Sequence, residues 1–247
     1  MRYLIALAFL AASPAVAQDA GHGYSLSADL GLGASYGPSY MGSEDKDTSA
    51  WIILRNAKLL RPGASGETSG DGFAILPSFR MLGSRDADDH DELSGMNDID
   101  RAGELGARMI YDYGNARGFL ALRKGFGGHD GFVGELGARY LISASDRLTL
   151  TTTAEARFGD SDFTETYFGV TPEESARSGY TAYTPEGGFY AAAVGLEARY
   201  AITPDMAVLG EVQYTRLLDD AADSPIVQSE GEPRVRLGVV RRFDFRF

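Results

Sequence analysis

The sequence predicts an all-β protein, a transmembrane antiparallel up-and-down β-barrel of about ten strands with a charged interior. Successive segments alternate apolar and polar residues, and each is near the roughly 9–11 residues with which a tilted strand crosses a bilayer. The connections alternate between long polar loops and shorter turns. The last segment, residues 234–247, has one apolar face and one charged face and ends on an aromatic residue. Together these features are typical of bacterial outer-membrane barrels.

The first residues have the pattern of a secretory signal peptide. Arg2 forms the charged start, residues 4–12 the apolar core and residues 15–17 an Ala-Val-Ala cleavage site, so cleavage is predicted after Ala17. A membrane anchor is disfavoured because this apolar run is far shorter than the roughly 20 residues of a spanning helix. The predicted organisation is a signal peptide at residues 1–17 and one barrel domain at residues 18–247.

Ten segments are predicted as strands. Pro77 weakens the third segment, because proline has no N–H to donate to a neighbouring strand. The last strand is expected to pair with the first and so remove the remaining free edge. The predicted strands are residues 24–36, 50–60, 73–82, 101–113, 116–126, 132–142, 147–158, 189–201, 206–217 and 234–247.

The lengths of the connections support this assignment. With the amino terminus in the periplasm, four of the five outward loops are long and three of the four inward turns are short. Twelve strands are the alternative, if residues 61–72 or 159–188 contain a further hairpin. A soluble two-layer sandwich is the other alternative, but it has no reason to sort its connections by length. The outward loops are residues 37–49, 83–100, 127–131, 159–188 and 218–233, and the inward turns are residues 61–72, 114–115, 143–146 and 202–205.

The composition limits the possible partners. The chain has 23 Lys and Arg against 35 Asp and Glu, a formal net charge of −12. This balance argues against nucleic acid or an anionic membrane surface as a partner. The sequence has no cysteine, and a barrel needs none because its hydrogen-bond ladder already holds it together.

Charged residues recur on the faces predicted to point into the barrel. A cation on the lipid side costs about 2–4 kcal/mol at the bilayer midplane, so these side chains are expected in the interior. In a narrow barrel they should pair across strands and fill the space, which favours a structural plug of salt bridges over a selective pore. The predicted network comprises Asp29, Arg80, Glu104, Arg108, Glu135, Arg139, Glu155, Arg157, Glu197, Arg199, Glu211, Arg234 and Arg236.

Two groups of residues invite a chemical hypothesis, and neither supports one strongly. The acidic loop at residues 84–100 lacks the EF-hand pattern, so a solvated loop is favoured over carboxylates that share divalent cations with lipid phosphates. The histidines are His22, His90 and His129, and no Gly-x-Ser-x-Gly motif supplies a nucleophile. We therefore predict no enzyme, no catalytic residue, no metal and no cofactor.

Three segments outside the strands are more specific than the general barrel pattern. They are GPSYMGSED at residues 37–45, YFGVTP followed by SGY and AY within residues 167–183, and DDAADSPIV at residues 219–227. On these motifs the chain resembles the MipA/OmpV family of outer-membrane proteins over almost its whole length. The segment at residues 167–180 is expected to fold as a cap whose aromatic residues pack over the barrel mouth.

The resemblance implies a location, a function and partners. It implies a non-catalytic barrel in the bacterial outer membrane, in contact with outer-membrane lipid or lipopolysaccharide. It further implies a scaffold that brings a lytic murein transglycosylase to a penicillin-binding protein. A small-solute channel or an adhesin is the alternative. The final Phe247 resembles the signal that the barrel-assembly machinery reads.

Overall fold

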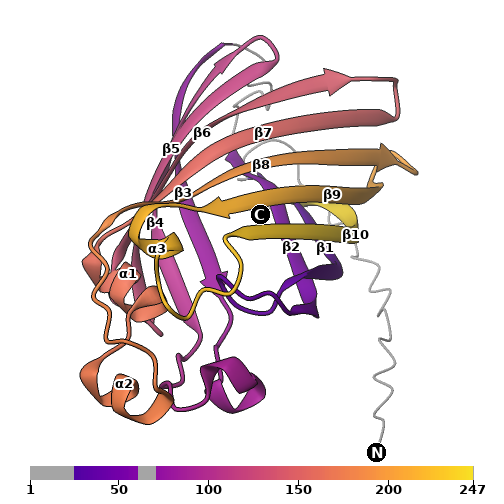
Figure 1. The fold of residues 1–247 in the computed structure, drawn as a ribbon. Coiled ribbons are helices and arrows are strands. Elements are labelled where there is room, and N and C mark those ends of the chain that lie inside the picture. The colour runs from indigo at the N-terminus through magenta and orange to yellow at the C-terminus, as the bar shows by residue number, and fades with distance from the viewer. Residues whose placement is uncertain (1–24, 61–70, 247) are drawn as a thin grey trace, which may run out of the picture.

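The described residues form one continuous antiparallel sheet of ten strands that curls strongly (Figure 1). The computed structural model describes residues 25–60 and 71–246, and the predicted signal peptide and Phe247 lie outside these ranges. Within these ranges the predicted number of ten strands is confirmed, and residues 61–70, one of the two places for the further hairpin of the twelve-stranded alternative, lie outside them. The strands are β1 (Ser25–Pro38), β2 (Lys46–Leu60), β3 (Gly72–Leu82), β4 (Ala102–Tyr113), β5 (Ala116–Gly127), β6 (Phe132–Ser143), β7 (Leu148–Gly159), β8 (Gly188–Ala201), β9 (Met206–Leu217) and β10 (Gly231–Arg246).

The first and last strands pair as predicted, with Leu32 of β1 opposite Val239 of β10. The sheet order runs from β2 through β1 and β10 to β3, so β2 and β3 form its two edges within the described ranges. The expectation that the β1–β10 pair removes the last free edge is therefore wrong for this part of the chain. Pro77 lies on the edge strand β3, where a residue without an N–H is tolerated.

The outward face of the sheet is apolar and carries aromatic residues at both ends. Phe126, Phe132, Phe158 and Phe189 lie where β5 to β8 approach the long loops. At the opposite end lie Tyr113, Tyr140 and Tyr200, all of them about half exposed or more. Exposed aromatic girdles on either side of an apolar band suit a surface that faces lipid, with the girdles at the two membrane interfaces.

The long loops fold together into a cap at one end of the sheet (Figure 1). We use the name cap for residues 39–45, 83–101, 160–187 and 218–230. Its short helices are η1 (Ala87–Asp89), η2 (Asp91–Leu93), α1 (Ser161–Phe168), α2 (Pro172–Ser178) and α3 (Asp219–Ala222). Residues 159–188 thus contain helices rather than the extra hairpin of the twelve-stranded alternative.

Aromatic residues hold the cap on the sheet. Phe163 and Phe168 of α1 are fully buried and pack against Tyr190 of β8, with ring centroids 4.9 and 6.1 Å from it. The predicted cap segment, residues 167–180, contributes Tyr167 and Phe168 to this packing, both of them buried, as expected. No helix among the described residues is long and apolar enough to cross a membrane.

Candidate functional site: the charged interior and its cap

The larger charge cluster lies where β3 to β6 reach the cap, and we call Arg80, Glu104, Arg108, Arg123 and Glu135 the capped network. The strand register places Arg80 opposite Glu104. Arg80 Nη2 lies 2.6 Å from Glu104 Oε1, and Arg80 Nε lies 2.7 Å from Glu104 Oε2. Arg123 donates to Glu104 Oε2 at 3.0 Å and also bonds Glu135. Arg108 Nη2 donates to Glu135 Oε2 at 2.7 Å.

The centre of this network is buried, whereas Arg80 and Arg108 at its edge are 22% and 24% exposed. The side chain of Glu104 is fully buried and that of Arg123 is 2% exposed. Three guanidinium groups surround two carboxylates, so each carboxylate accepts from at least two cations. Buried charges of this kind are tolerated only when their hydrogen bonds are made, which is the case here for both carboxylates.

His129 connects the capped network to the cap. Its side chain is completely buried, and Nε2 lies 3.4 Å from Glu104 Oε1. Its Nδ1 accepts a hydrogen bond from the Gly131 N–H at 3.2 Å, which fits a neutral ring whose proton is on Nε2. The ring contacts Phe163 and Tyr167 of α1 edge-on, with centroids 5.2 and 5.6 Å apart.

A second cluster lies farther from the cap, and we call Arg55, Glu197, Glu211 and Arg236 the open network. Arg55 of β2 reaches across the interior to both Glu197 of β8 and Glu211 of β9. Arg236 Nη1 lies 2.6 Å from Glu211 Oε1. Both guanidinium groups lie 5.7 Å from the ring centroid of Trp51. The Arg55 side chain is 36% exposed, so water reaches this network.

The remaining inward charges form smaller contacts. Arg242 Nε lies 3.0 Å from Asp29 Oδ1, and Arg157 Nη2 lies 2.8 Å from Glu155 Oε1 on the same strand. The inward arginines that make no ion pair within the described ranges are Arg139, Arg199 and Arg234.

Comparison with known proteins identifies the family. The family described as "MltA-interacting protein MipA" matches residues 30–243. The chain belongs to the MipA family. It is 33% identical over 96 residues to the MltA-interacting protein of Escherichia coli (strain K12), which covers 39% of this chain and 38% of that relative. It is 29% identical over 114 residues to "Putative outer membrane protein YiaT" of the same strain, which covers 46% of each chain. The matches thus span less than half the length of these relatives.

Solved barrel structures resemble the chain more distantly. The NanC porin has a TM-score of 0.39 at 9% identity, covering 87% of this chain and 98% of the porin. Neisserial surface protein A has a TM-score of 0.27 at 11% identity, covering 89% and 97%. The protein is an outer-membrane β-barrel protein of the MipA family, in keeping with its apolar outward face and with the relative named for that membrane.

Most of the charged residues chosen from the sequence of this MipA-family protein lie in the interior. The structure brings Arg80, Glu104, Arg108 and Glu135 into one network, and Glu197, Glu211 and Arg236 into the other. Arg139, Arg199 and Arg234 lie on inward positions without a carboxylate partner in the described part of the chain.

Sequence reasoning missed several members of the site. The irregular alternation of residues 116–126 does not predict an inward Arg123, although Leu120 and Leu122 facing outward imply that Arg123 faces inward. His129 belongs to the predicted outward loop at residues 127–131, where a solvent-exposed side chain is expected, but it is buried under α1. No local pattern predicts this, because α1 comes from a loop about 30 residues later in the sequence.

Buried polar groups of the cap have shifted acidities. Burial raises the pKa of Tyr167 to about 12, with the charge of Glu104 adding to the effect. Burial also raises the pKa of Tyr40, whose hydroxyl donates to Glu92 Oε1 at 3.3 Å. Burial lowers the pKa of Arg85, whose Nη1 donates to the carbonyl oxygen of Tyr167 at 2.9 Å. The cap thus buries polar groups of which some are paired, such as Tyr40 Oη and Arg85 Nη1, and some, such as Tyr167 Oη, have no hydrogen-bond partner among the described residues.

The acidic loop is part of the folded cap. Asp98 Oδ1 accepts from the Ala87 N–H at 2.7 Å, and Leu93 between them is fully buried. The described residues contain no group of three or more metal-ligating side chains that could hold a metal ion. The hydrogen bond of Asp98 and the burial of Leu93 show that the loop contributes to the packing of the cap.

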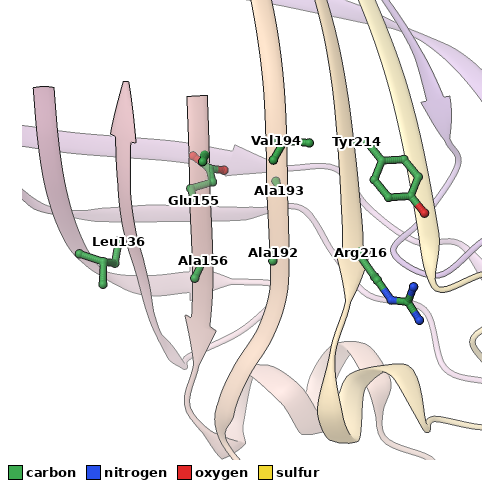
Figure 2. Close-up of a pocket in the computed structure, with 9 residues that line it drawn as sticks. Leu136, Glu155, Ala156, Ala192, Ala193, Val194, Tyr214 and Arg216 are labelled. Carbon is green, nitrogen blue, oxygen red and sulfur yellow. The ribbon is translucent and has the colours of Figure 1, made fainter. Parts of the chain in front are cut away.

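A hollow of about 450 Å³ opens on the outward face between β6 and β9 (Figure 2). Ala156 and Ala192 form its floor, because their small side chains lie between Leu136 on one side and Arg216 on the other. Arg216 at its rim is bound to Glu230 at 2.8 Å. The hollow is part of the lipid-facing surface and holds no converging set of reactive groups.

Proposed function

We propose that this MipA-family protein is a non-catalytic scaffold of the cell envelope that holds a murein-cleaving enzyme beside a murein-synthesising enzyme. The observation that carries the proposal is the family match over residues 30–243, since that family and a relative are named for interaction with MltA. The proposed organisation of the mature chain is a single barrel domain that follows a cleaved signal peptide.

The packing of the interior favours a scaffold over a solute channel. The cap covers one end of the sheet, and the capped network fills the space beneath it with paired charges. A small-solute channel needs a continuous aqueous path through the barrel. The paired charges and the cap occupy the space that such a path would need. We expect the purified protein to remain silent in a planar bilayer at neutral pH.

The partner is expected at the end opposite the cap. Long loops of bacterial barrels face outward and short turns face the periplasm, where murein enzymes act. The short turns here expose Asp146, Arg147 and Asp205, whose side chains make no hydrogen bond or ion pair within the described residues. These charged groups are available to a partner.

Chemical crosslinking in intact envelopes tests the proposal. Full-length tagged protein should recover a murein transglycosylase, and the triple variant Asp146→Ser, Arg147→Ser and Asp205→Ser should reduce recovery about tenfold or more. The matched control is Asp88→Ser with Asp89→Ser in the cap, which should leave recovery unchanged. Failure of the unmodified protein to recover any murein enzyme would overturn the proposal.

A further inference from the structure

One wall of the interior combines free hydroxyl groups with unpaired arginines. Thr149, Thr151 and Thr153 occupy alternate positions on β7 and therefore share its inward face. Their hydroxyl groups make no hydrogen bond with other described residues, and all three are partly exposed to the interior. A row of unsatisfied hydroxyls in an accessible position is free to bind a ligand.

Two arginines without ion pairs flank this row. The strand register places Arg139 of β6 opposite Thr153 and Arg199 of β8 opposite Thr149. The two arginines thus lie on opposite sides of the same strand, separated by about 13 Å along it. Arginine side chains are long, so both guanidinium groups can extend toward Thr151, which lies midway between them.

The side chain of Arg139 is positioned by contact with a neighbouring aromatic ring. Its guanidinium lies 5.1 Å from the centroid of the Phe119 ring. The ring packs over Gly137, where any side chain would collide with it. The Nε of Arg139 is buried and has no hydrogen-bond partner in the described residues. An unsatisfied buried donor is costly, and a ligand oxygen or water would relieve it.

The local charge is positive although the whole chain is strongly negative. Glu197 lies opposite Thr151, but its carboxylate is already bound by Arg55 of the open network. Glu155 follows Thr153 on the same face and is bound by Arg157. Arg139 and Arg199 therefore face the threonine row without an ion pair of their own within the described residues. Guanidinium and hydroxyl donors are the groups that bind carboxylate and phosphate oxygens in proteins.

We propose that Arg139, Arg199 and the threonines between them form an oxyanion-binding site that takes a small solute bearing a carboxylate or a phosphate. The cap covers the other end, so the solute enters from the end of the short turns, near which β7 begins and β8 ends. This site is independent of the scaffold proposal, because it lies inside the barrel and not on the turns.

Isothermal titration calorimetry on the detergent-folded full chain tests the site. The probes are inorganic phosphate and succinate, each titrated at constant low ionic strength. Saturable binding of either probe supports the site. Tighter binding of succinate would indicate a carboxylate solute, and tighter binding of phosphate a phosphorylated one. Arg139→Gln and Arg199→Gln should each weaken binding about tenfold or more, since hydrogen bonds to charged groups are being lost.

Arg234→Gln is the matched control, because Arg234 also faces the interior without an ion pair but lies on β10, away from the threonine row. It should change the affinity less than twofold. Thr151→Val keeps the shape of the side chain but removes its hydroxyl group, and it should weaken binding several-fold. This variant replaces an arginine variant as the test if that variant fails to fold. Absence of saturable binding to the unmodified protein, or equal weakening by Arg234→Gln, would overturn the proposal.

Discussion

The two charge networks use the same chemistry in different surroundings. In the capped network Glu104 is fully buried and Arg123 is 2% exposed, whereas in the open network Glu211 is 13% and Arg55 is 36% exposed. His129 and α1 cover the buried centre of the first, around Glu104 and Arg123, whereas the carboxylates and arginines of the second are all partly exposed.

The difference in burial decides what each network contributes. A buried ion pair has lost its hydration, so removing one partner leaves an uncompensated charge in a poorly polarisable environment. A partly exposed pair can replace a lost partner with water. The same substitution should therefore have very different consequences in the two networks, and the capped network should also control how the cap is attached.

Glu104→Gln should have the largest effect. The substitution leaves Arg80 and Arg123 facing a neutral amide at a buried position, where they share the carboxylate of Glu135 with Arg108. Breaking such a buried contact costs about 3–5 kcal/mol. The free energy of unfolding in detergent micelles, measured by urea titration, should fall by that amount. A loss below about 1 kcal/mol would show that water enters the capped network and that the contrast with the open network is wrong.

Phe163→Ala should destabilise the cap and spare the sheet. Phe163 is fully buried between His129 and Tyr190, so truncation leaves a cavity that costs about 3 kcal/mol. Limited proteolysis should cut residues 160–187 faster, while the heat-modifiable gel shift of the folded barrel persists. Phe189→Ala at the exposed rim is the control and should leave the cap's protection unchanged. Loss of the gel shift in Phe163→Ala would mean that cap and sheet unfold as one unit.

The sheet was predictable from the sequence, and the cap contacts were not. A period of two shows directly which residues of β4 or β6 face inward, so Glu104 and Glu135 could be assigned to the interior. Which arginine each carboxylate binds depends on strand register and curl, neither of which leaves a local pattern. The contact between His129 and Phe163 joins two loops and depends on how they fold over the mouth, so no spacing in the sequence reveals it.

The pH dependence of the cap should follow Glu174 at the start of α2. Burial alone would raise the pKa of Glu174, but hydrogen bonds from the N–H groups of Thr171 and Asn97, at 2.8 and 2.9 Å, hold it below the ordinary value. A carboxyl whose folded-state pKa is lowered stabilises the fold above its unfolded pKa of about 4.3, and this stability is lost as the pH falls through the folded pKa.

Protonation of Glu174 should therefore remove about 2 kcal/mol from the cap in acid, the contribution of hydrogen bonds to a charged group. The measurement is the rate of cleavage of residues 160–187 by pepsin, compared between about pH 5 and about pH 2, either side of the titration of a carboxyl. Glu174→Gln retains an acceptor without the charge and should show a flatter pH profile. An identical profile in both proteins would assign the acid response to another carboxylate, outside α2.

Glu211→Gln should have the smallest effect and completes the comparison. Its two guanidinium partners keep other interactions, because Arg55 also binds Glu197 and both cations lie on the Trp51 ring. Water can solvate the guanidinium groups that lose Glu211, so the free energy of unfolding should fall by about 1 kcal/mol or less. Trp51 is the single tryptophan of the sequence, so its fluorescence reports this network directly. A loss as large as that of Glu104→Gln would mean that burial does not distinguish the networks, and that the number of arginines around each carboxylate decides instead.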